Sequence, residues 1–200
     1  PSSPSPAKDW GSAIHTAVLE PHTIGDRYTL DPESPKGGYP AGWRNSNEYK
    51  AQAAAAKSGG LELLTADEFD QLQQIAANVA AHEVGAQLHA LPGFREVSVF
   101  AKDSEFDLRR KCRPDWLIPR ARMIVDVKSA RDHRPGPFAR ACHTYGYHLS
   151  AAYYLDTVST EIDVEHYVLL VVNAEPPFEV AAYTLDRDSI EQGRKEYREA

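Results

Sequence analysis

An aspartate and a lysine interrupt a strongly apolar stretch of this 200-residue chain, MIVDVK at residues 123–128. The β-branched and aliphatic residues around them are typical of a central β-strand. Because side chains alternate along a strand, Asp126 and Lys128 are expected on the same face. Burying both charges costs free energy unless they pair with each other or serve a metal ion. The stretch therefore predicts either a structural ion pair or a metal site.

A second carboxylate, Asp115, lies eleven residues upstream in KCRPDWLI. Residues 111–118 are expected to form the neighbouring strand, with alternate residues buried on one face and Pro119 ending it. Two carboxylates on adjacent strands form an oxygen-rich site suited to Mg²⁺ or Mn²⁺. A lysine beside them can orient or deprotonate an attacking water, which is the arrangement required for metal-assisted phosphodiester hydrolysis.

Length and composition indicate one globular domain over residues 1–200, with a Pro- and Ser-rich, irregular segment at 1–9. No apolar run is long enough to span a bilayer, and the N-terminal residues lack the apolar core of a signal peptide, so no membrane partner is expected. Cys112 and Cys142 are expected to be reduced core residues of a cytoplasmic protein, with a disulfide as the alternative. Two cysteines are too few for a cysteine-held cluster.

The charge is distributed unevenly along the chain. The net charge is −7, but residues 109–140 hold ten Lys/Arg against three Asp, a local charge of +7. The remaining residues hold twelve Lys/Arg against 26 Asp/Glu, a charge of −14. Basic residues thus cluster around the candidate site, where phosphates would lie, although a charged and solvated turn would give the same pattern.

The rest of the chain alternates between helical and strand patterns. Thr65 and Glu68 form a capping box at the start of a long helix, and Asp186 can cap the last helix. Residues 21–45 are expected as a long loop with a brief strand at 27–30, of a length typical of a functional flap; residues 102–106 and 129–137 are expected as a turn and a basic loop. The expected helices are residues 10–20, 47–57, 65–91, 138–155 and 188–199, and the expected strands are residues 94–101, 111–118, 123–128, 165–172 and 178–185.

The first three of these main strands are expected to pair consecutively as an antiparallel meander. A helix, two consecutive strands joined by a turn at residues 174–177, and a last helix then follow. This order predicts an α/β (α+β) fold in which a central mixed β-sheet is flanked by helices.

Five further residues have two readings on the sequence alone. Glu96 is either a third acidic ligand or an exposed strand residue. His15 lies within a helix, where a lone histidine is usually a packing or surface residue. Tyr145, Tyr147 and His148 are suitable neighbours for a phosphate or a base, but tyrosine at helical spacing is also typical of a core.

Pro114, Asp115, Asp126, Val127 and Lys128 together match the PD-(D/E)XK signature. With the matches that flank them, the chain resembles the PD-(D/E)XK exonucleases of the RecE type, relatives of phage lambda exonuclease and of RecB-type nuclease domains. The resemblance implies a restriction-endonuclease-like core and covers nearly the whole chain. The flanking matches are Gly11 to His15, Leu19 to Pro21, Leu64 to Glu68, Glu96 to Ser98, Cys112 to Leu117, Tyr145 to Leu149, Ala152 to Asp156 and Glu175 to Pro177.

The resemblance also implies roles for individual residues. Asp115 and Asp126 would be the principal metal ligands, completed by the Val127 carbonyl, and Lys128 would position or activate the attacking water. Glu96 and His15 would lie beside the metals or the scissile phosphate. Relatives commonly carry Gln where this chain has Ser150, whose shorter side chain cannot donate the same amide hydrogen bonds. The residues expected to contact DNA are Tyr145, His148, Arg113, Arg131 and Arg134.

The function implied by the resemblance is a Mg²⁺-dependent exodeoxyribonuclease, with Mn²⁺ as a possible substitute. It would digest linear double-stranded DNA from 5′ to 3′ and leave a 3′ single strand for a RecT-like annealing partner in recombination and repair. It would be a ring-shaped homo-oligomer in the cytoplasm, bacterial or phage-encoded. The alternatives are a PD-(D/E)XK endonuclease or repair nuclease, and a catalytically silent DNA-binding module.

Overall fold

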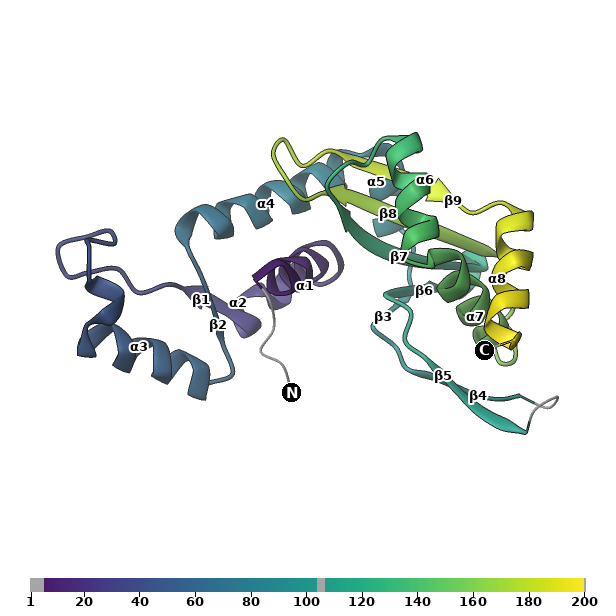
Figure 1. Ribbon diagram of the computed structural model, residues 1–200, viewed down its shortest axis with the longest axis horizontal. Coiled ribbons are helices and arrows are strands. Elements are labelled where there is room, and N and C mark those ends of the chain that lie inside the picture. Colours follow the sequence, from purple (N-terminus) through teal and green to yellow (C-terminus); the bar gives the residue numbers. More distant parts are fainter. Residues whose placement is uncertain (1–5, 104–106, 200) are drawn as a thin grey trace.

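The computed structural model of the protein describes residues 6–103 and 107–199 and is built on a five-stranded mixed sheet (Figure 1). The strand order is β3-β6-β7-β8-β9, in which β7 and β8 are parallel and the other neighbours are antiparallel. The expected mixed sheet is therefore confirmed. Its strands are β3 (Phe94–Arg95), β6 (Trp116–Ile118), β7 (Met123–Ala130), β8 (His166–Asn173) and β9 (Val180–Thr184).

Helices cover both faces of this sheet, because alternate side chains of β7 are apolar on each face. Val125 and Val127 belong to the core formed with helices α1, α4 and α5, whereas Ile124 belongs to the core formed with α6, α7 and α8. A strand buried on both faces is largely apolar, as β8 is, and β7 departs from this pattern at Asp126 and Lys128. The helices are α1 (Pro6–Leu19), α4 (Ala66–Ala81), α5 (Glu83–His89), α6 (Pro135–Thr144), α7 (Tyr147–Val158) and α8 (Arg187–Glu199).

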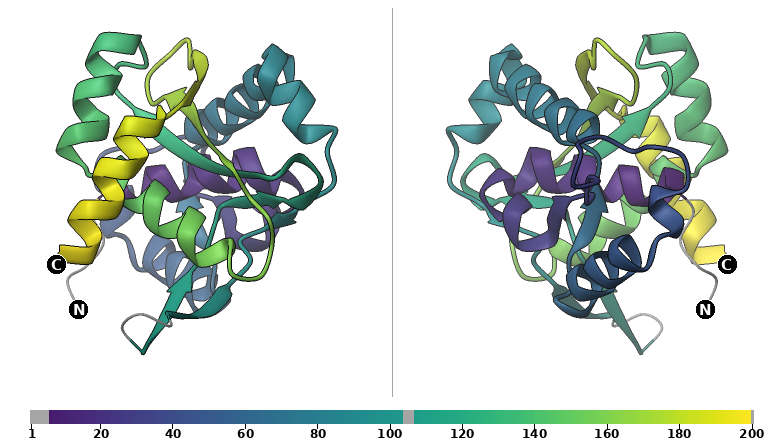
Figure 2. Two further views of the ribbon diagram at one scale, coloured as in Figure 1. Left: turned by 90° about the vertical axis from the view of Figure 1, so that its right-hand side faces the viewer. Right: turned by 90° about the vertical axis from the view of Figure 1, so that its left-hand side faces the viewer.

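The segment expected as a loop at 21–45 is largely structured. It contains the short helices η1 (Pro21–Thr23), α2 (Ile24–Arg27) and η2 (Trp43–Asn45), and the expected brief strand is β1 (Tyr28–Leu30). Strand β1 pairs in parallel with β2 (Glu62–Leu64), and α3 (Asn47–Ser58) connects the two. These elements form a lobe at the left of Figure 1, and Figure 2 shows the same lobe in front of the sheet when viewed from that side.

Two predicted strands are wrong in part, because each breaks beside a candidate site residue. The strand expected at 94–101 divides into β3 and β4 (Val99–Asp103), and the one expected at 111–118 divides into β5 (Leu108–Cys112) and β6. β4 and β5 pair only with each other, so a hairpin is inserted into the expected meander. Part of the turn expected at 102–106 lies outside the described residues.

Three helix boundaries also differ from expectation. The helix expected at 65–91 breaks at His82, whose side chain accepts from the backbone N–H of Gly85 and caps α5. The helix expected at 138–155 begins at Pro135 and breaks at Gly146, which has a φ of 65° that favours glycine. Residues 6–9 of the segment expected to be irregular belong to α1.

Local capping signals are confirmed. Thr65 and Glu68 form both bonds of the capping box at the start of α4. Asp186 accepts from the backbone N–H of Ser189 at 2.7 Å in the first turn of α8. Both cysteines are free, and burial raises the pKa of the Cys112 thiol to about 11. No helix in the described residues is both long and apolar enough to cross a bilayer.

The crossing of α7 and α8 depends on Gly193. A Cβ atom at this position would lie 2.3 Å from the His148 carbonyl oxygen, which is far inside van der Waals contact. We expect Gly193→Ala to lower the free energy of unfolding by about 2 kcal/mol, because α7 and α8 must separate to admit the methyl group. Gly136→Ala is the matched control in α6, since the nearest atom there is 3.9 Å away. Chemical denaturation of both variants tests this, and equal stability would contradict it.

Candidate metal centre and catalytic site

The predicted pair in β7 is formed. The Lys128 ammonium lies 2.6 Å from Asp126 Oδ1, on the face of β7 that both side chains share. The Tyr167 hydroxyl, from β8, donates to the other Asp126 oxygen at 2.9 Å. Lys128 also lies 5.0 Å from the centre of the Tyr147 ring. Asp126 is therefore buried with partners on both oxygens, which fixes the position of the lysine.

Asp115 reaches the same site from the irregular turn between β5 and β6. Its Oδ2 accepts from the backbone N–H of Val127 at 2.7 Å, so the carboxylate is held against β7 next to Asp126. Burial and the neighbouring Asp126 carboxylate raise the pKa of Asp115 to about 8. Two carboxyl groups this close do not both ionise readily without a nearby cation.

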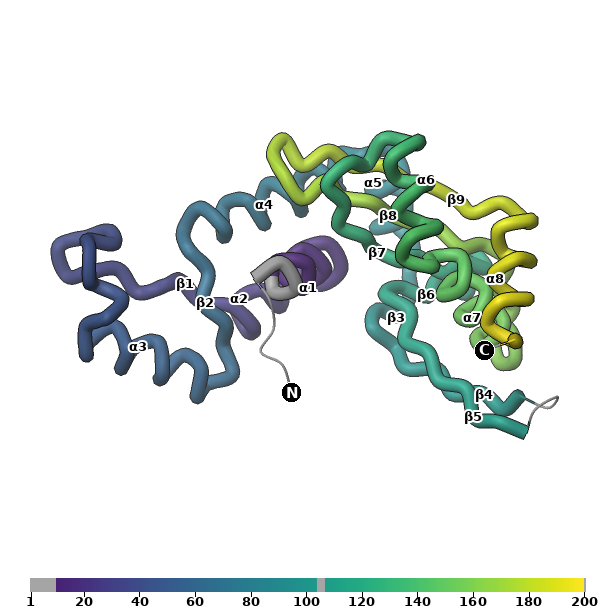
Figure 3. The backbone as a smooth tube through the Cα atoms, viewed as in Figure 1, coloured from purple at the N-terminus to yellow at the C-terminus, as the bar shows by residue number. Residues whose placement is uncertain are grey.

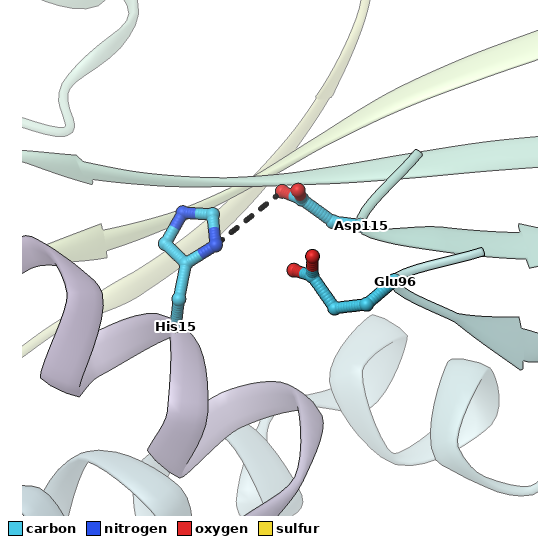
Figure 4. Close-up of side chains that lie close together, drawn as sticks. All are labelled: His15, Glu96 and Asp115. Carbon is cyan, nitrogen blue, oxygen red and sulfur yellow. Dashed lines mark ion pairs between the residues drawn. The ribbon is translucent and has the colours of Figure 1, made fainter. Parts of the chain in front are cut away.

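Two further groups meet Asp115 in the described part of the chain. One potential ligand atom each from His15, Glu96 and Asp115 lies within 4.8 Å of the others, which is a spacing that suits a shared metal ion. Figure 4 shows His15 pointing from α1 toward Asp115, with Glu96 beside them, and the His15 Nδ1–Asp115 Oδ2 distance is 3.6 Å. The cluster thus joins helix α1, through His15, to the break between β3 and β4 at Glu96 and to the break between β5 and β6 at Asp115.

His15 is suited to be a nitrogen ligand. Burial and the positive charge of Lys128 lower its pKa below the ordinary value of 6.5, so the ring is neutral at neutral pH. A neutral imidazole offers a lone pair to a metal, whereas an imidazolium does not. Val127 lines the same cavity as His15, and its carbonyl stays a predicted ligand.

Glu96 reaches the cluster because its backbone leaves the strand conformation. Its φ is 52°, in the left-handed region, and its N–H donates to the Asp115 carbonyl at 3.0 Å. This unfavourable conformation for a non-glycine residue turns the side chain toward the cluster. Arg113 Nε lies 3.0 Å from Glu96 Oε2 and remains largely exposed, so a positive charge borders the metal ligands.

His15, Glu96 and Lys128 line an open cavity of about 630 Å³ between α1, the N-terminal lobe and the C-terminal half of β7. Its lining also includes the basic residues Arg113 and Arg27 and the acidic residues Glu20 and Glu62, and Arg27 pairs with Glu20 at 2.6 Å. Tyr167 and Arg27 were missed by the sequence analysis, because only the tertiary structure brings β8 and α2 to this place. Part of the segment expected as a flap at 21–45 lines the cavity, through Arg27.

The residues expected to contact DNA do not all face the cavity. Tyr145 is exposed at the break between α6 and α7 and stacks on Tyr147, whose ring lines the cavity. His148 instead points away, into the contact with α8, where its Nε2 lies 3.1 Å from Glu196 Oε2. His148 is therefore outside the cavity lining, and its contact with DNA stays a prediction. Because α7 begins at Tyr147, the Tyr147 side chain lines the cavity and that of His148 does not.

The remaining positions lie around the turn after β7. Arg131 is exposed there, and Arg134 forms two hydrogen bonds from its guanidinium to the carboxylate of Asp132. Ser150 is exposed on α7. Neither arginine belongs to the cavity lining, although both lie in the same basic segment of the chain as Lys128.

The donor set fits a divalent metal ion. Asp115 and Glu96 provide carboxylate oxygens and His15 a neutral nitrogen. Asp126, the other expected principal ligand, is held by Lys128 and Tyr167, and its role as a ligand stays a prediction. Oxygen-rich sites of this kind select Mg²⁺ or Mn²⁺, and the imidazole makes Mn²⁺ the better accepted of the two. A cation here would also relieve the repulsion that raises the pKa of Asp115.

A mixed sheet between two helical layers, with two carboxylates and a lysine gathered at its central strand, is typical of the restriction-endonuclease-like fold class. The chain belongs to the family described as the PDDEXK-like domain of unknown function (DUF3799), whose model matches residues 1–200. Membership confirms the resemblance drawn from Asp115, Asp126 and Lys128. No curated protein matches the chain.

One solved structure shares the fold at low sequence identity. A protein from Eubacterium rectale named "Putative exonuclease" superposes with a TM-score of 0.61 at 14% identity, over 98% of this chain and 65% of that one. The present chain thus spans about two thirds of that structure. A phage-related exonuclease from Haemophilus somnus 129PT gives a TM-score of 0.41 at 11% identity, over 91% of this chain and 87% of that one.

Proposed function

We propose that this protein is a Mg²⁺- or Mn²⁺-dependent deoxyribonuclease that digests linear double-stranded DNA from 5′ to 3′. The observation that carries the proposal is the grouping of Asp115 with His15 and Glu96 beside the Asp126–Lys128 pair, at an open cavity that His15, Glu96 and Lys128 line. A structural ion pair alone would not explain two further ligand residues aimed at the same point. Family membership and the name of the E. rectale neighbour agree with nuclease chemistry.

Each residue has a separate part in this chemistry. A divalent ion, when bound, would polarise the scissile phosphate and neutralise the charge that develops on it. Asp115, Glu96 and His15 would hold the ion. Lys128, which is paired with Asp126, would hold and orient an attacking water, and Arg113, which is paired with Glu96, would contact a neighbouring phosphate.

The finer features of the proposal rest on the resemblance to RecE-type enzymes. Digestion from 5′ ends would leave 3′ single strands, which a RecT-like protein would anneal during recombination and repair. A ring-shaped homo-oligomer would keep the enzyme on its duplex. A cytoplasmic location in a bacterium, with a phage as one source of the gene, would accompany this role.

A digestion assay tests the proposal. We expect the protein with Mg²⁺ or Mn²⁺ to degrade linear 5′-phosphorylated duplex to completion and to leave covalently closed circles intact at least a hundredfold longer. Strand direction follows from duplexes labelled at either end, with the 5′ label released first.

Three other outcomes would change the assignment. Cutting of the closed circles would indicate an endonuclease, and release of the 3′ label first would reverse the polarity. Failure to cleave any DNA with either metal, by protein that binds Mn²⁺, would contradict the nuclease proposal.

A further inference from the structure

The β4–β5 hairpin extends beyond the body of the molecule beside the site. Figure 1 and Figure 3 show it leaving the sheet near β3, and both views in Figure 2 show it projecting away from the helices. The pairing register places Phe100 opposite Lys111 and Lys102 opposite Arg109. All four side chains are exposed and share one face of the hairpin, which we call the basic face.

The opposite face anchors the hairpin to the domain. Val99 and Cys112 are buried in the core that includes α7 and α8, and the Tyr153 hydroxyl of α7 hydrogen-bonds the backbone of Lys111. Arg110 pairs with Asp103 on this inner side and lies 5.6 Å from the centre of the Tyr197 ring in α8. Because one face is packed, the basic face keeps a defined orientation.

The basic face combines cations with an aromatic ring. Phe100 is 66% exposed, and the Lys111 ammonium lies 5.4 Å from the centre of its ring. Lys102 pairs with Asp107 at 2.5 Å, but both side chains are more than two-thirds exposed, so this pair is weak and leaves a net positive surface. Exposed aromatics between lysines and arginines are the means by which proteins stack the bases and track the phosphates of single-stranded nucleic acid.

The basic face is continuous with the catalytic cavity. Strand β5 ends at Cys112, the next residue is Arg113, and Arg113 contacts Glu96 in the cavity. A nucleic-acid strand that follows the lysines and arginines of β5 would therefore arrive at the metal cluster. The chain as a whole is acidic, so this run of positive charge stands out from the remaining surface.

We propose that the basic face of the β4–β5 hairpin binds single-stranded DNA next to the scissile phosphate, with Phe100 stacking on a base and Lys102, Arg109 and Lys111 contacting phosphates. The inference rests on the proposed nuclease function and deepens it by assigning one DNA strand a path along the basic face of the hairpin. Duplex phosphates would meet the same cations but leave Phe100 without a partner.

Binding measured without hydrolysis tests this inference. Fluorescence anisotropy with a labelled 15-nucleotide oligothymidylate in EDTA reports affinity when no metal is present. We expect Phe100→Ala to weaken binding about tenfold, and Phe100→Trp to restore it, since a base stacks on either ring. Phe94→Ala is the matched control, because Phe94 is also exposed but lies on β3.

The charges are tested by a triple variant of Lys102, Arg109 and Lys111 to Ala. We expect it to bind at least thirtyfold more weakly in 0.1 M salt, with the slope of log affinity against log salt reduced by about 2. Its control replaces three exposed cations elsewhere, Arg120, Arg187 and Lys195, with Ala. Thermal unfolding confirms that each variant folds.

Two results would overturn the inference. One is a loss of affinity in the control triple equal to that in the hairpin triple, which would indicate an effect of net charge alone. The other is equal weakening by Phe100→Ala on a blunt 15-base-pair duplex and on the single strand. Neither result touches the nuclease proposal, which depends on whether the wild-type protein cleaves DNA.

Discussion

Lys128→Arg is expected to abolish DNA cleavage while preserving the fold. An arginine keeps the positive charge beside Asp126 and can retain the ion pair that now spans 2.6 Å. It cannot give up its proton, and its planar group cannot occupy the position of a compact ammonium. We expect the rate of digestion at saturating metal to fall by a factor of about 10²–10⁴, as when a positioned acid–base group is removed.

The outcome separates a catalytic lysine from a structural one. If Lys128 served only to neutralise Asp126, Lys128→Arg would cleave at a rate near wild type and only Lys128→Met would be impaired. Lys50→Arg, on the exposed surface of α3, is the control for the substitution itself. Single-turnover digestion of linear duplex, with unfolding temperatures measured in parallel, distinguishes these cases.

Asp115→Asn is expected to stabilise the metal-free protein while it removes activity. Burial and Asp126 raise the pKa of Asp115 from 3.8 to about 8, so its ionisation opposes folding. A group whose pKa is raised in the folded state contributes stability at low pH, and this contribution is lost as the pH rises from about 4 through about 8. We expect metal-free wild-type protein to lose on the order of 3 kcal/mol between pH 5 and pH 9, and the variant to lose much less.

The amide also preserves the local structure. An asparagine oxygen can still accept from the Val127 N–H, as Asp115 does at 2.7 Å. Asp70→Asn, exposed on α4, is the control and should leave the pH dependence unchanged. Urea unfolding in EDTA at several pH values gives the comparison. A variant less stable than wild type at pH 9 would contradict the assignment of Asp115 as a repelled carboxylate.

The parts of the site that follow from local pattern were predictable. Alternation in MIVDVK was sufficient to place Asp126 and Lys128 on one face, because strand geometry permits nothing else. The capping box at Thr65 likewise depends only on residues three positions apart. Asp115 could be assigned to the site because it precedes a strand that pairs antiparallel with the strand of Asp126. This pairing brings the two carboxylates together.

Other features depend on contacts between distant segments. The left-handed conformation of Glu96 has no local signature, because glutamate rarely adopts it, and it is held by the Asp115 carbonyl. The separate hairpin was not predicted, because β4 and β5 have the same sequence pattern as strands of the central sheet. They differ from those strands in that they pair with each other. Tyr167 looks like a core residue in sequence, and its bond to Asp126 arises from the pairing of β8 with β7.

The central claim is that His15, Glu96 and Asp115 hold a divalent ion beside Asp126 and Lys128. Calorimetric titration of metal-free protein with Mn²⁺ tests it most directly, because binding is measured whether or not cleavage occurs. We predict saturable binding by wild-type protein and by Lys128→Arg, and at least a thirtyfold weaker affinity for Asp115→Asn and for His15→Ala. Absence of saturable binding by the wild type, or equal affinity in Asp115→Asn, would contradict the account.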